Sequence, residues 1–333
     1  MEEIKLVSNK TQENNFEDKL NEFLKENGLN LEVKPRVETV ETLKNSENKE
    51  FIEDYVIAND HKLATEASKI FLAYKNGDKQ LLVAKENTKE DIDKLIELNN
   101  WGNKTVEEHL KEKKFNNPNV ILPIETIEKN RKVYRFYEAM DMNLEKYLET
   151  HKKLPLKDGI SLMMRACVGV EDLNKAGVIN VDLAPLNIML SNNNLKLIDL
   201  DGASIINDKD NIVFRNQEGN NRFTAAPELF KKNPCFDKTV DVYAAAVNLY
   251  RLIYGNWPYN IEEQTMGISF EEKTNAYKKL HEENNINFPE SVPYEIQMVI
   301  RKGMSPKPEN RYQSIKDFMI NLLEAYNKSE KNQ

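Results

Sequence analysis

The sequence predicts an α+β fold with two lobes, a small β-rich amino-terminal lobe and a larger helical carboxy-terminal lobe. Two observations carry this prediction. Short β-type runs are concentrated between residues 51 and 140, and long amphipathic helical patterns follow from there to the end of the chain. Strands that come first and helices that come later indicate segregated layers and not alternating βαβ units.

Residues 1–50 are polar and charge-rich, and we expect them to form an amino-terminal extension. Within them, Phe16, Leu20, Phe23 and Leu24 recur at helical spacing, which predicts a short helix. Residues 38–50 hold few large apolar side chains and are expected to be a linker.

The expected small lobe covers residues 51–140 and is predicted mainly from β-type runs. Asn76, Gly77 and Asp78 stand between two of these runs and indicate a hairpin turn. A charged region with a helical pattern covers residues 89–114. The predicted strands are residues 51–58, 69–74, 81–85, 120–123 and 132–138.

The expected large lobe covers residues 141–328 and leaves a short tail at 329–333. Its helices are predicted from apolar residues that recur at the helical period. The clearest helical segments are residues 159–174, 240–254, 294–302 and 315–326.

Charge and composition exclude several classes of function. The net charge of −8 disfavours a nucleic-acid-binding protein. Cys167 and Cys235, the two cysteines, make neither a disulfide framework nor a metal cluster. The chain has no uninterrupted apolar run of about 18 residues, so no membrane span is expected. We expect a cytoplasmic protein, with secretion as a bacterial effector into a host cell as the alternative.

Two neighbouring segments carry the strongest chemical signal. Residues 177–190 read GVINVDLAPLNIML, and residues 195–202 read LKLIDLDG. Together they resemble the catalytic loop of the protein kinase family and the strand that follows it, which ends in Asp-Phe-Gly. The resemblance implies a bilobal protein-kinase-like fold that binds ATP with Mg (or Mn).

The resemblance assigns roles to three residues in these segments. Asp182 would accept or orient the proton of the attacking hydroxyl. Asn187 and Asp199 would be the metal ligands, because divalent metals that carry nucleotides prefer oxygen ligands.

Four later segments resemble further kinase motifs in the family's order. They are Ala226-Pro227-Glu228, residues 238–244, residues 249–259 and residues 306–312. In the family, a late arginine pairs with the glutamate of Ala-Pro-Glu, which here implies an ion pair between Arg311 and Glu228. This pair would hold the activation segment in place.

The resemblance also names residues for the nucleotide in the first half of the chain. Lys85 ends the run Leu81-Leu82-Val83-Ala84-Lys85 and would hold the α and β phosphates. Its carboxylate partner is expected to be Glu108 by spacing, with Glu97 as an alternative on a better apolar pattern. Residues 134–140 resemble the hinge.

At the hinge, Tyr137 would be the gatekeeper. The backbones of Glu138 and Met140 would meet the adenine edge, and Asn143 would lie near the ribose. These positions follow from the resemblance and not from any pattern of their own.

The sequence departs from the family in the two loops that face the phosphates. The glycine loop is replaced by residues 61–69, which contain no glycine. Ala184 and Leu186 occupy the two positions where the family usually has a lysine or arginine. Since a charge on the migrating phosphoryl group is worth much in a dry site, this loss weighs against fast transfer.

Two further departures concern regulation and metal binding. The His-Arg of the catalytic loop is Asn180-Val181, so the receptor for an activation-loop phosphate is missing. Asp-Phe-Gly is replaced by Asp199-Leu200-Asp201. Asp199 and Asp201 are then alternatives for the metal ligand, and we expect Asp199, because Leu200 then fills the apolar position of the phenylalanine.

These observations predict an ATP-dependent protein kinase that phosphorylates a serine or threonine hydroxyl of an unidentified protein substrate. The alternative is a weak or inactive pseudokinase that binds nucleotide or another protein. A small-molecule phosphotransferase is disfavoured, because the Ala-Pro-Glu segment and Arg311 serve a peptide-binding activation segment.

Overall fold

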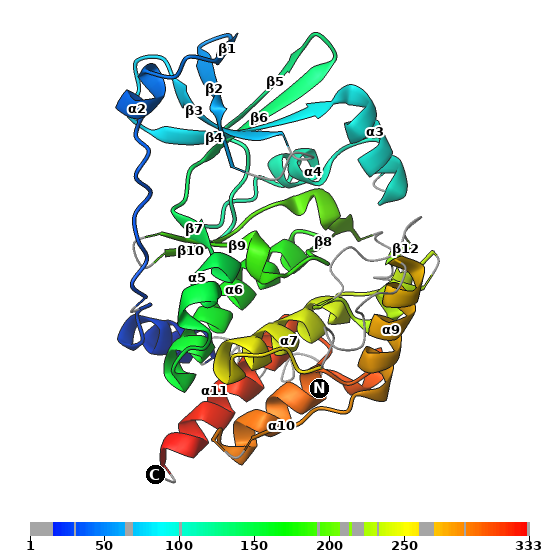
Figure 1. The fold of residues 1–333 in the computed structure, drawn as a ribbon. Helices are drawn as coiled ribbons and strands as arrows, with labels where there is room; N and C mark the ends of the chain where they lie inside the picture. The colour runs from blue at the N-terminus through cyan, green and yellow to red at the C-terminus, as the bar shows by residue number, and fades with distance from the viewer. Residues whose placement is uncertain are drawn as a thin grey trace, which may run out of the picture.

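The computed structural model has the predicted α+β architecture, with a β-rich lobe above a helical lobe (Figure 1). It describes residues 16–29, 31–63, 69–99, 102–191, 194–206, 213–214, 223–231, 233–259, 270–289 and 291–331.

An antiparallel sheet of six strands forms the small lobe, in the order β1-β2-β3-β4-β6-β5. Apolar clusters cover both of its faces. Gly77 makes the predicted turn between β3 and β4 with a positive φ of 89°. The strands are β1 (Lys49–Ile52), β2 (Tyr55–Lys62), β3 (Ile70–Lys75), β4 (Leu81–Thr88), β5 (Glu125–Lys129) and β6 (Lys132–Glu138).

Three local expectations in this lobe were wrong. The run 51–58 is not one strand, because Glu53 turns the chain with a φ of 52° between β1 and β2. Residues 120–123 form only an isolated bridge, from Val120 to Leu197, and the strand follows at β5. The expected linker over 38–50 contains a short helix, α2 (Val40–Lys44), and the start of β1.

Two helices occupy the region with the charged helical pattern: α3 (Lys89–Leu98) and α4 (Val106–Glu112). Each begins with a capping box, built by Thr88 for α3 and by Thr105 for α4. In α4, His109 Nε2 lies 2.9 Å from the carbonyl oxygen of Ala176 at the end of α6. This contact joins α4 to the large lobe.

The large lobe is built around α7, in which nearly every residue is buried. Gly303 lets α10 approach α7 closely, since a Cβ there would lie 2.7 Å from the Cβ of Ala246. The helices are α5 (Leu144–His151), α6 (Leu156–Lys175), α7 (Thr239–Tyr254), α9 (Phe270–Glu283), α10 (Tyr294–Gly303) and α11 (Ile315–Lys331).

Short strands and 3₁₀ turns lie where the two lobes meet and beside α9. β10, β9 and β7 form a three-stranded sheet, and two pairs, β11 with β8 and β12 with β13, complete the set. The short strands are β7 (Met142–Asn143), β8 (Val178–Ile179), β9 (Ile188–Ser191), β10 (Asn194–Leu197), β11 (Ser204–Ile205), β12 (Val213–Phe214) and β13 (Cys235–Phe236). The 3₁₀ turns are η1 (Pro185–Asn187), η2 (Leu200–Gly202), η3 (Pro227–Phe230) and η4 (Pro308–Asn310).

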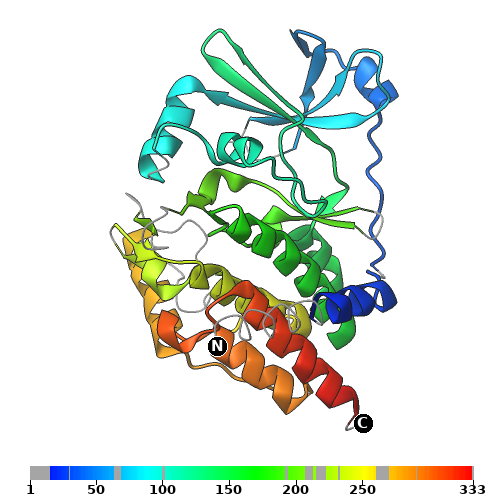
Figure 2. The ribbon, with the colours of Figure 1, turned by 180° about the vertical axis from the view of Figure 1, so that it is seen from behind.

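The amino-terminal extension lies against both lobes. Residues 16–26 form the predicted helix, which lies beside the large lobe near α11, and the chain then runs along the edge of the molecule to α2 (Figures 1 and 2). Among the described residues, no helix combines the length and the apolar character that crossing a membrane requires.

Candidate active site

A cavity of about 430 Å³ lies between the lobes. Seven of the residues predicted for the nucleotide site line it: Lys85, Tyr137, Glu138, Met140, Asn143, Asn187 and Asp199. The remaining lining residues are Arg36, Leu63, Ile70, Val83, Ile121, Asp141, Lys146, Leu186, Met189 and Ile198. One end of the cavity is therefore formed by the hinge, and charged side chains project into the other.

Helix α7 holds the loop that carries Asp182 through the side chain of Asp241. The buried carboxylate of Asp241 accepts hydrogen bonds from the backbone N–H groups of Asn180 (3.0 Å) and Val181 (2.8 Å). Burial raises the pKa of Asp241 to about 6, although both N–H donors act to lower it. Val181 has a φ of 65°, a strained conformation for a β-branched residue, and the Asp241 contacts hold it there.

Asp182 lies beside the cavity and is joined to Asn187. The Asn187 Nδ2 donates to the backbone oxygen and to Oδ2 of Asp182, both at 3.0 Å. Asn187 itself lines the cavity from the short turn η1. The predicted acceptor carboxylate and one predicted metal ligand are thus neighbours.

Asp199 and Asp201 face different surroundings. The side chain of Asp199 is 41% exposed and lines the cavity, whereas that of Asp201 is 17% exposed and lies deeper. Leu200 is buried in the large core between them. Asp199 therefore lies on the cavity side and Leu200 on the core side, and that Asp199 faces a metal stays a prediction.

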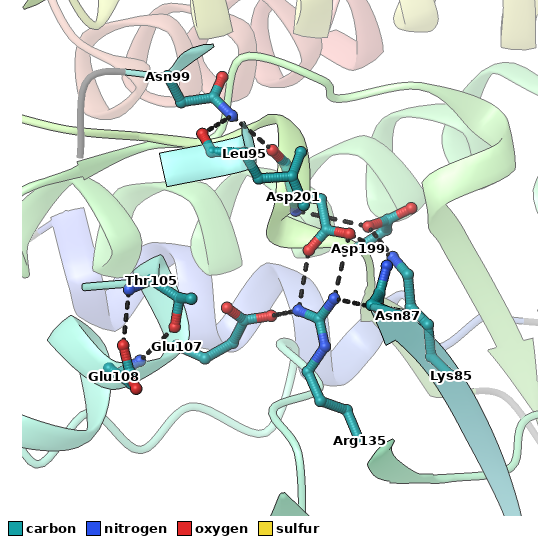
Figure 3. A network of polar contacts seen from close by, with 10 residues as sticks. All are labelled: Lys85, Asn87, Leu95, Asn99, Thr105, Glu107, Glu108, Arg135, Asp199 and Asp201. Atoms are coloured by element: carbon teal, nitrogen blue, oxygen red, sulfur yellow. Dashed lines mark hydrogen bonds and ion pairs between the residues drawn. The ribbon is translucent and has the colours of Figure 1, made fainter. Parts of the chain in front are cut away.

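Lys85 is held by both of these aspartates (Figure 3). Its Nζ lies 2.8 Å from Asp199 Oδ1 and 2.6 Å from Asp201 Oδ2. Burial acts to lower the pKa of Lys85, but the two carboxylates outweigh it and raise the pKa above its usual value. Lys85 is therefore a charged ammonium at neutral pH.

A second cation, Arg135, shares Asp201 with Lys85. Lys85 and Arg135 are paired residues on the adjacent antiparallel strands β4 and β6, so their side chains leave the same face of the sheet. Arg135 Nη1 lies 2.9 Å from Asp201 Oδ1 and 2.7 Å from Glu107 Oε1 of α4. The result is a buried chain of charges, Lys85–Asp201–Arg135–Glu107, visible in Figure 3.

Burial and charge act in opposite directions within this chain. For Asp201, burial acts to raise the pKa, but Lys85 and Arg135 outweigh it and lower the pKa to about 2. For Glu107, burial dominates and raises the pKa in spite of Arg135. The carboxylate of Asp201, which both cations share, therefore stays ionised at neutral pH.

The expected pairing of Lys85 with Glu108 was wrong. Glu108 instead accepts a hydrogen bond from the backbone N–H of Thr105 (2.7 Å) and caps α4, pointing away from Lys85 (Figure 3). Glu97, the alternative, is an exposed residue of α3. The α4 carboxylate that reaches the site is Glu107, and it binds Arg135.

Sequence reasoning also missed Arg135 as a site residue, and it considered Asp201 only as the alternative metal ligand and not as the partner of Lys85 and Arg135. The available signal was positional: Arg135 stands two residues before Tyr137 on a predicted strand, and Asp201 stands two residues after Asp199. In the kinase motifs that suggested the site, the positions that match Arg135 and Asp201 are not charged residues.

Asn143 also lines the cavity, although its side chain already has one structural task. Its Oδ1 accepts a hydrogen bond from the backbone N–H of Lys146 (2.8 Å) and caps α5. Of residues 61–69, which replace the glycine loop, 64–68 lie outside the described part of the chain.

Replacing Asp201 by asparagine should reduce the free energy of unfolding by about 1–3 kcal/mol, because two buried cations lose their shared anion. Asp199→Asn is the matched control, since it makes the same change at another partner of Lys85. Because Asp199 is more exposed, the control should cost less than about 1 kcal/mol. Urea unfolding without nucleotide measures both, and an equal or larger loss for Asp199→Asn would contradict the assigned role of Asp201.

The predicted ion pair between Arg311 and Glu228 is present and buried. Arg311 Nη1 and Nη2 lie 2.6 and 2.8 Å from the two carboxylate oxygens of Glu228. Arg311 also donates to the carbonyl oxygens of Ser305 (2.7 Å) and Pro306 (2.9 Å). These contacts hold the turn η3, and a further bond from Arg311 Nη1 to the carbonyl oxygen of Thr239 (3.3 Å) connects it to the start of α7.

Comparison of the sequence with known proteins points to the same family as the motifs that suggested these contacts. The model of the protein kinase domain matches residues 65–322. A probable serine/threonine-protein kinase of Clostridium perfringens is 24% identical over 213 residues, covering 62% of this chain and 30% of that protein.

Eukaryotic relatives have a similar percentage of identical residues. The hormonally up-regulated neu tumor-associated kinase homolog B of Xenopus laevis is 27% identical over 199 residues, covering 58% of this chain and 30% of that protein. A serine/threonine-protein kinase of Schizosaccharomyces pombe is 28% identical over 155 residues, covering 45% of this chain and 20% of that protein. The matched part of the chain thus spans less than a third of the length of these relatives.

Proposed function

The chain belongs to the protein kinase family, and from this we propose that it transfers the terminal phosphoryl group of ATP to a serine or threonine hydroxyl of a protein substrate. The observation that carries the proposal is the single cavity lined by Lys85, Asn187 and Asp199, with Asp182 hydrogen-bonded to Asn187 at its edge. These residues provide a phosphate-binding cation, oxygen ligands and a proton acceptor within one site.

The residues present fit a divalent metal that arrives with the nucleotide. Asp199 offers a carboxylate and Asn187 an amide oxygen, and Mg²⁺ is usually held by one or two such protein ligands together with phosphates. Within the described residues, no group of three or more His, Cys, Asp and Glu side chains forms a metal site of its own. When bound, Mg²⁺ or Mn²⁺ would neutralise the charge that develops on the phosphates.

We assign the base of the nucleotide to the hinge end of the cavity. Val83, Ile121, Met189 and Ile198 line it with apolar surface that suits a flat aromatic base. The backbones of Glu138 and Met140 would provide the polar contacts that orient the adenine.

Asp182 would orient the hydroxyl of the acceptor and take its proton as the oxygen attacks. Its contacts with Asn187 hold the carboxylate in one position, and Asp241 fixes the backbone of the preceding residue, Val181. Positioning of this kind is the main contribution a kinase makes to a reaction with a loose transition state.

One observation favours the alternative of a nucleotide-binding module that transfers phosphate slowly or not at all. Ala184, at a position where the family usually has a lysine or arginine, is buried and provides no charge. The transferred group then lacks one electrostatic partner.

Purified protein with Mg²⁺ or Mn²⁺ and ATP labelled on the terminal phosphate should label a generic acceptor protein. It should also melt at a higher temperature with ADP and metal, because the ligand binds the native state. Lys85→Met should reduce both effects, whereas Lys79→Met, an exposed lysine in the β3–β4 connection, should change neither. Melting that rises without labelling would support the binding module, and no rise at millimolar nucleotide would contradict both readings.

A further inference from the structure

The amino-terminal extension is anchored to the large lobe at one end. Ser161 Oγ of α6 donates to the carbonyl oxygen of Asn27 (2.6 Å), and Arg165 Nη2 donates to that of Leu24 (2.5 Å). The ring of Phe23 packs edge-on against Tyr326 of α11, with 5.5 Å between the ring centroids. These contacts fix the helix of residues 16–26 on α6 and α11.

The other end is anchored to the small lobe. Val40 and Leu43 of α2 are buried against the β2 and β3 residues Val56, Ala58 and Leu72. The capping box of Thr39 fixes the point at which this helix begins. Residues 31–38 lie between the two anchors, and we call them the hinge strap; one of them, Arg36, lines the cavity.

Arg36 of the hinge strap binds the hinge itself. Its Nε and Nη2 donate to the carbonyl oxygen of Met140 at 3.2 and 3.1 Å, and Nη2 also lies 3.4 Å from that of Asp141. Its backbone N–H donates to Asp141 Oδ1 (2.9 Å), and the other oxygen of this carboxylate accepts from Ser191 Oγ. The side chain of Arg36 is 17% exposed, and the residue lines the cavity.

These contacts occupy the Met140 carbonyl with two donors from a side chain that never loses its proton. Met140 lines the cavity, so the blocked acceptor lies at its base-binding end. In the proposed pose the Met140 N–H donates to N1 of adenine, so carbon 2 of the base faces the Met140 carbonyl, and adenine has no amino group there that needs an acceptor. A base with a 2-amino group meets an already satisfied carbonyl and a guanidinium, and the unpaired donor costs affinity.

We propose that Arg36 is a nucleotide-binding and specificity-determining residue, and that the hinge strap is a working part of the nucleotide site. The inference rests on the proposed function. Arg36 fixes the hinge backbone in its binding conformation, which lowers the ordering cost of adenine binding. It also selects against purines that carry a 2-amino group.

Titration calorimetry of the full chain with ADP and with 2-aminoadenosine diphosphate, each with Mg²⁺, tests the inference. Arg36→Ala should weaken ADP binding by roughly 3–10-fold, the range for one ordinary hydrogen bond, because the hinge loses the contacts that order it before the base binds. It should weaken 2-aminoadenosine diphosphate less or not at all, because the Met140 carbonyl becomes available. Arg36→Lys keeps the charge but not the two-donor geometry, so its affinity for ADP should lie between those of the wild type and Arg36→Ala.

Val37→Ala is the matched control, because Val37 is the next residue of the hinge strap and its side chain is 87% exposed. It should leave both affinities unchanged. Melting temperatures without nucleotide show whether each variant folds, and Arg36→Lys provides the comparison if Arg36→Ala does not. If a folded Arg36→Ala variant binds both nucleotides equally more weakly, Arg36 has only a structural role. That result would contradict the proposed selection against 2-amino purines.

The two proposals fail in different ways. Wild-type protein that binds no ADP would contradict the proposed function. Wild-type protein that binds ADP, with Arg36→Ala matching it in affinity and base preference, would contradict the role of Arg36 alone.

Discussion

Asp182→Ala should reduce the rate of phosphoryl transfer by about 10²–10⁴-fold, the contribution of a positioned acid–base group. The affinity for ADP should stay nearly constant, because this carboxylate is assigned to the acceptor hydroxyl and not to the nucleotide. Initial rates with labelled ATP measure the first effect, and calorimetry with ADP and Mg²⁺ measures the second.

The control is Asp78→Ala, which removes an exposed carboxylate from the β3–β4 connection and should change neither quantity. If Asp182→Ala and the wild type transfer phosphate equally slowly, the chain is a binding module and the residual rate is not enzymatic. If ADP binding is lost together with the rate, Asp182 acts on the nucleotide and its assigned task is wrong.

Arg311→Leu should reduce the free energy of unfolding by about 3–5 kcal/mol, because it leaves the buried carboxylate of Glu228 without a counter-charge. The Arg311 side chain is fully buried and that of Glu228 is 7% exposed, so water cannot replace the missing partner. Urea unfolding, followed by circular dichroism, measures the loss.

Two variants make this result specific. Arg301→Leu changes an exposed arginine of α10 and should cost less than about 1 kcal/mol. The double variant Arg311→Leu with Glu228→Leu should lose less stability than Arg311→Leu alone, because both buried charges are gone. Additive losses in the double variant would show that the two residues act independently.

The sequence predicted those parts of the site that depend on local order along the chain. Asp182, Asn187 and Asp199 lie in short segments whose residue order resembles the kinase catalytic loop and the strand that follows it. The pairing of Arg311 with Glu228 was predictable in the same way, because each belongs to a short segment with a recognisable order of residues. Both predictions depend on the resemblance, since sequence separation alone does not bring residues 228 and 311 together.

The charge chain was not predictable in the same way. Neighbouring residues on a helix point about 100° apart, so an error of one residue separates Glu107, which reaches the site, from Glu108, which caps the helix. The pairing of Lys85 with Arg135 depends on strand register, and sequence alone does not give the register of β4 against β6.

The missed elements of the small lobe have similar causes. Helix α2 has only five residues, too few to show a helical period, and its signal was the Thr39 cap alone. Arg36 carried no signal, because a single arginine in a polar segment is ordinary surface composition until the fold brings it to the hinge.

The charge chain has a consequence for how a nucleotide first meets the protein. Lys85 and Arg135 together carry two positive charges, and Asp199, Asp201 and Glu107 face them with three carboxyl groups. These five groups nearly cancel, so they give the cavity little long-range attraction for a bare polyphosphate. Because the chain as a whole carries a net charge of −8, electrostatics do not accelerate the encounter with an anionic nucleotide. Under the proposed function, a nucleotide that arrives with a divalent cation would meet the least resistance, because the cation would bind the exposed carboxylate of Asp199 while the phosphates would bind Lys85.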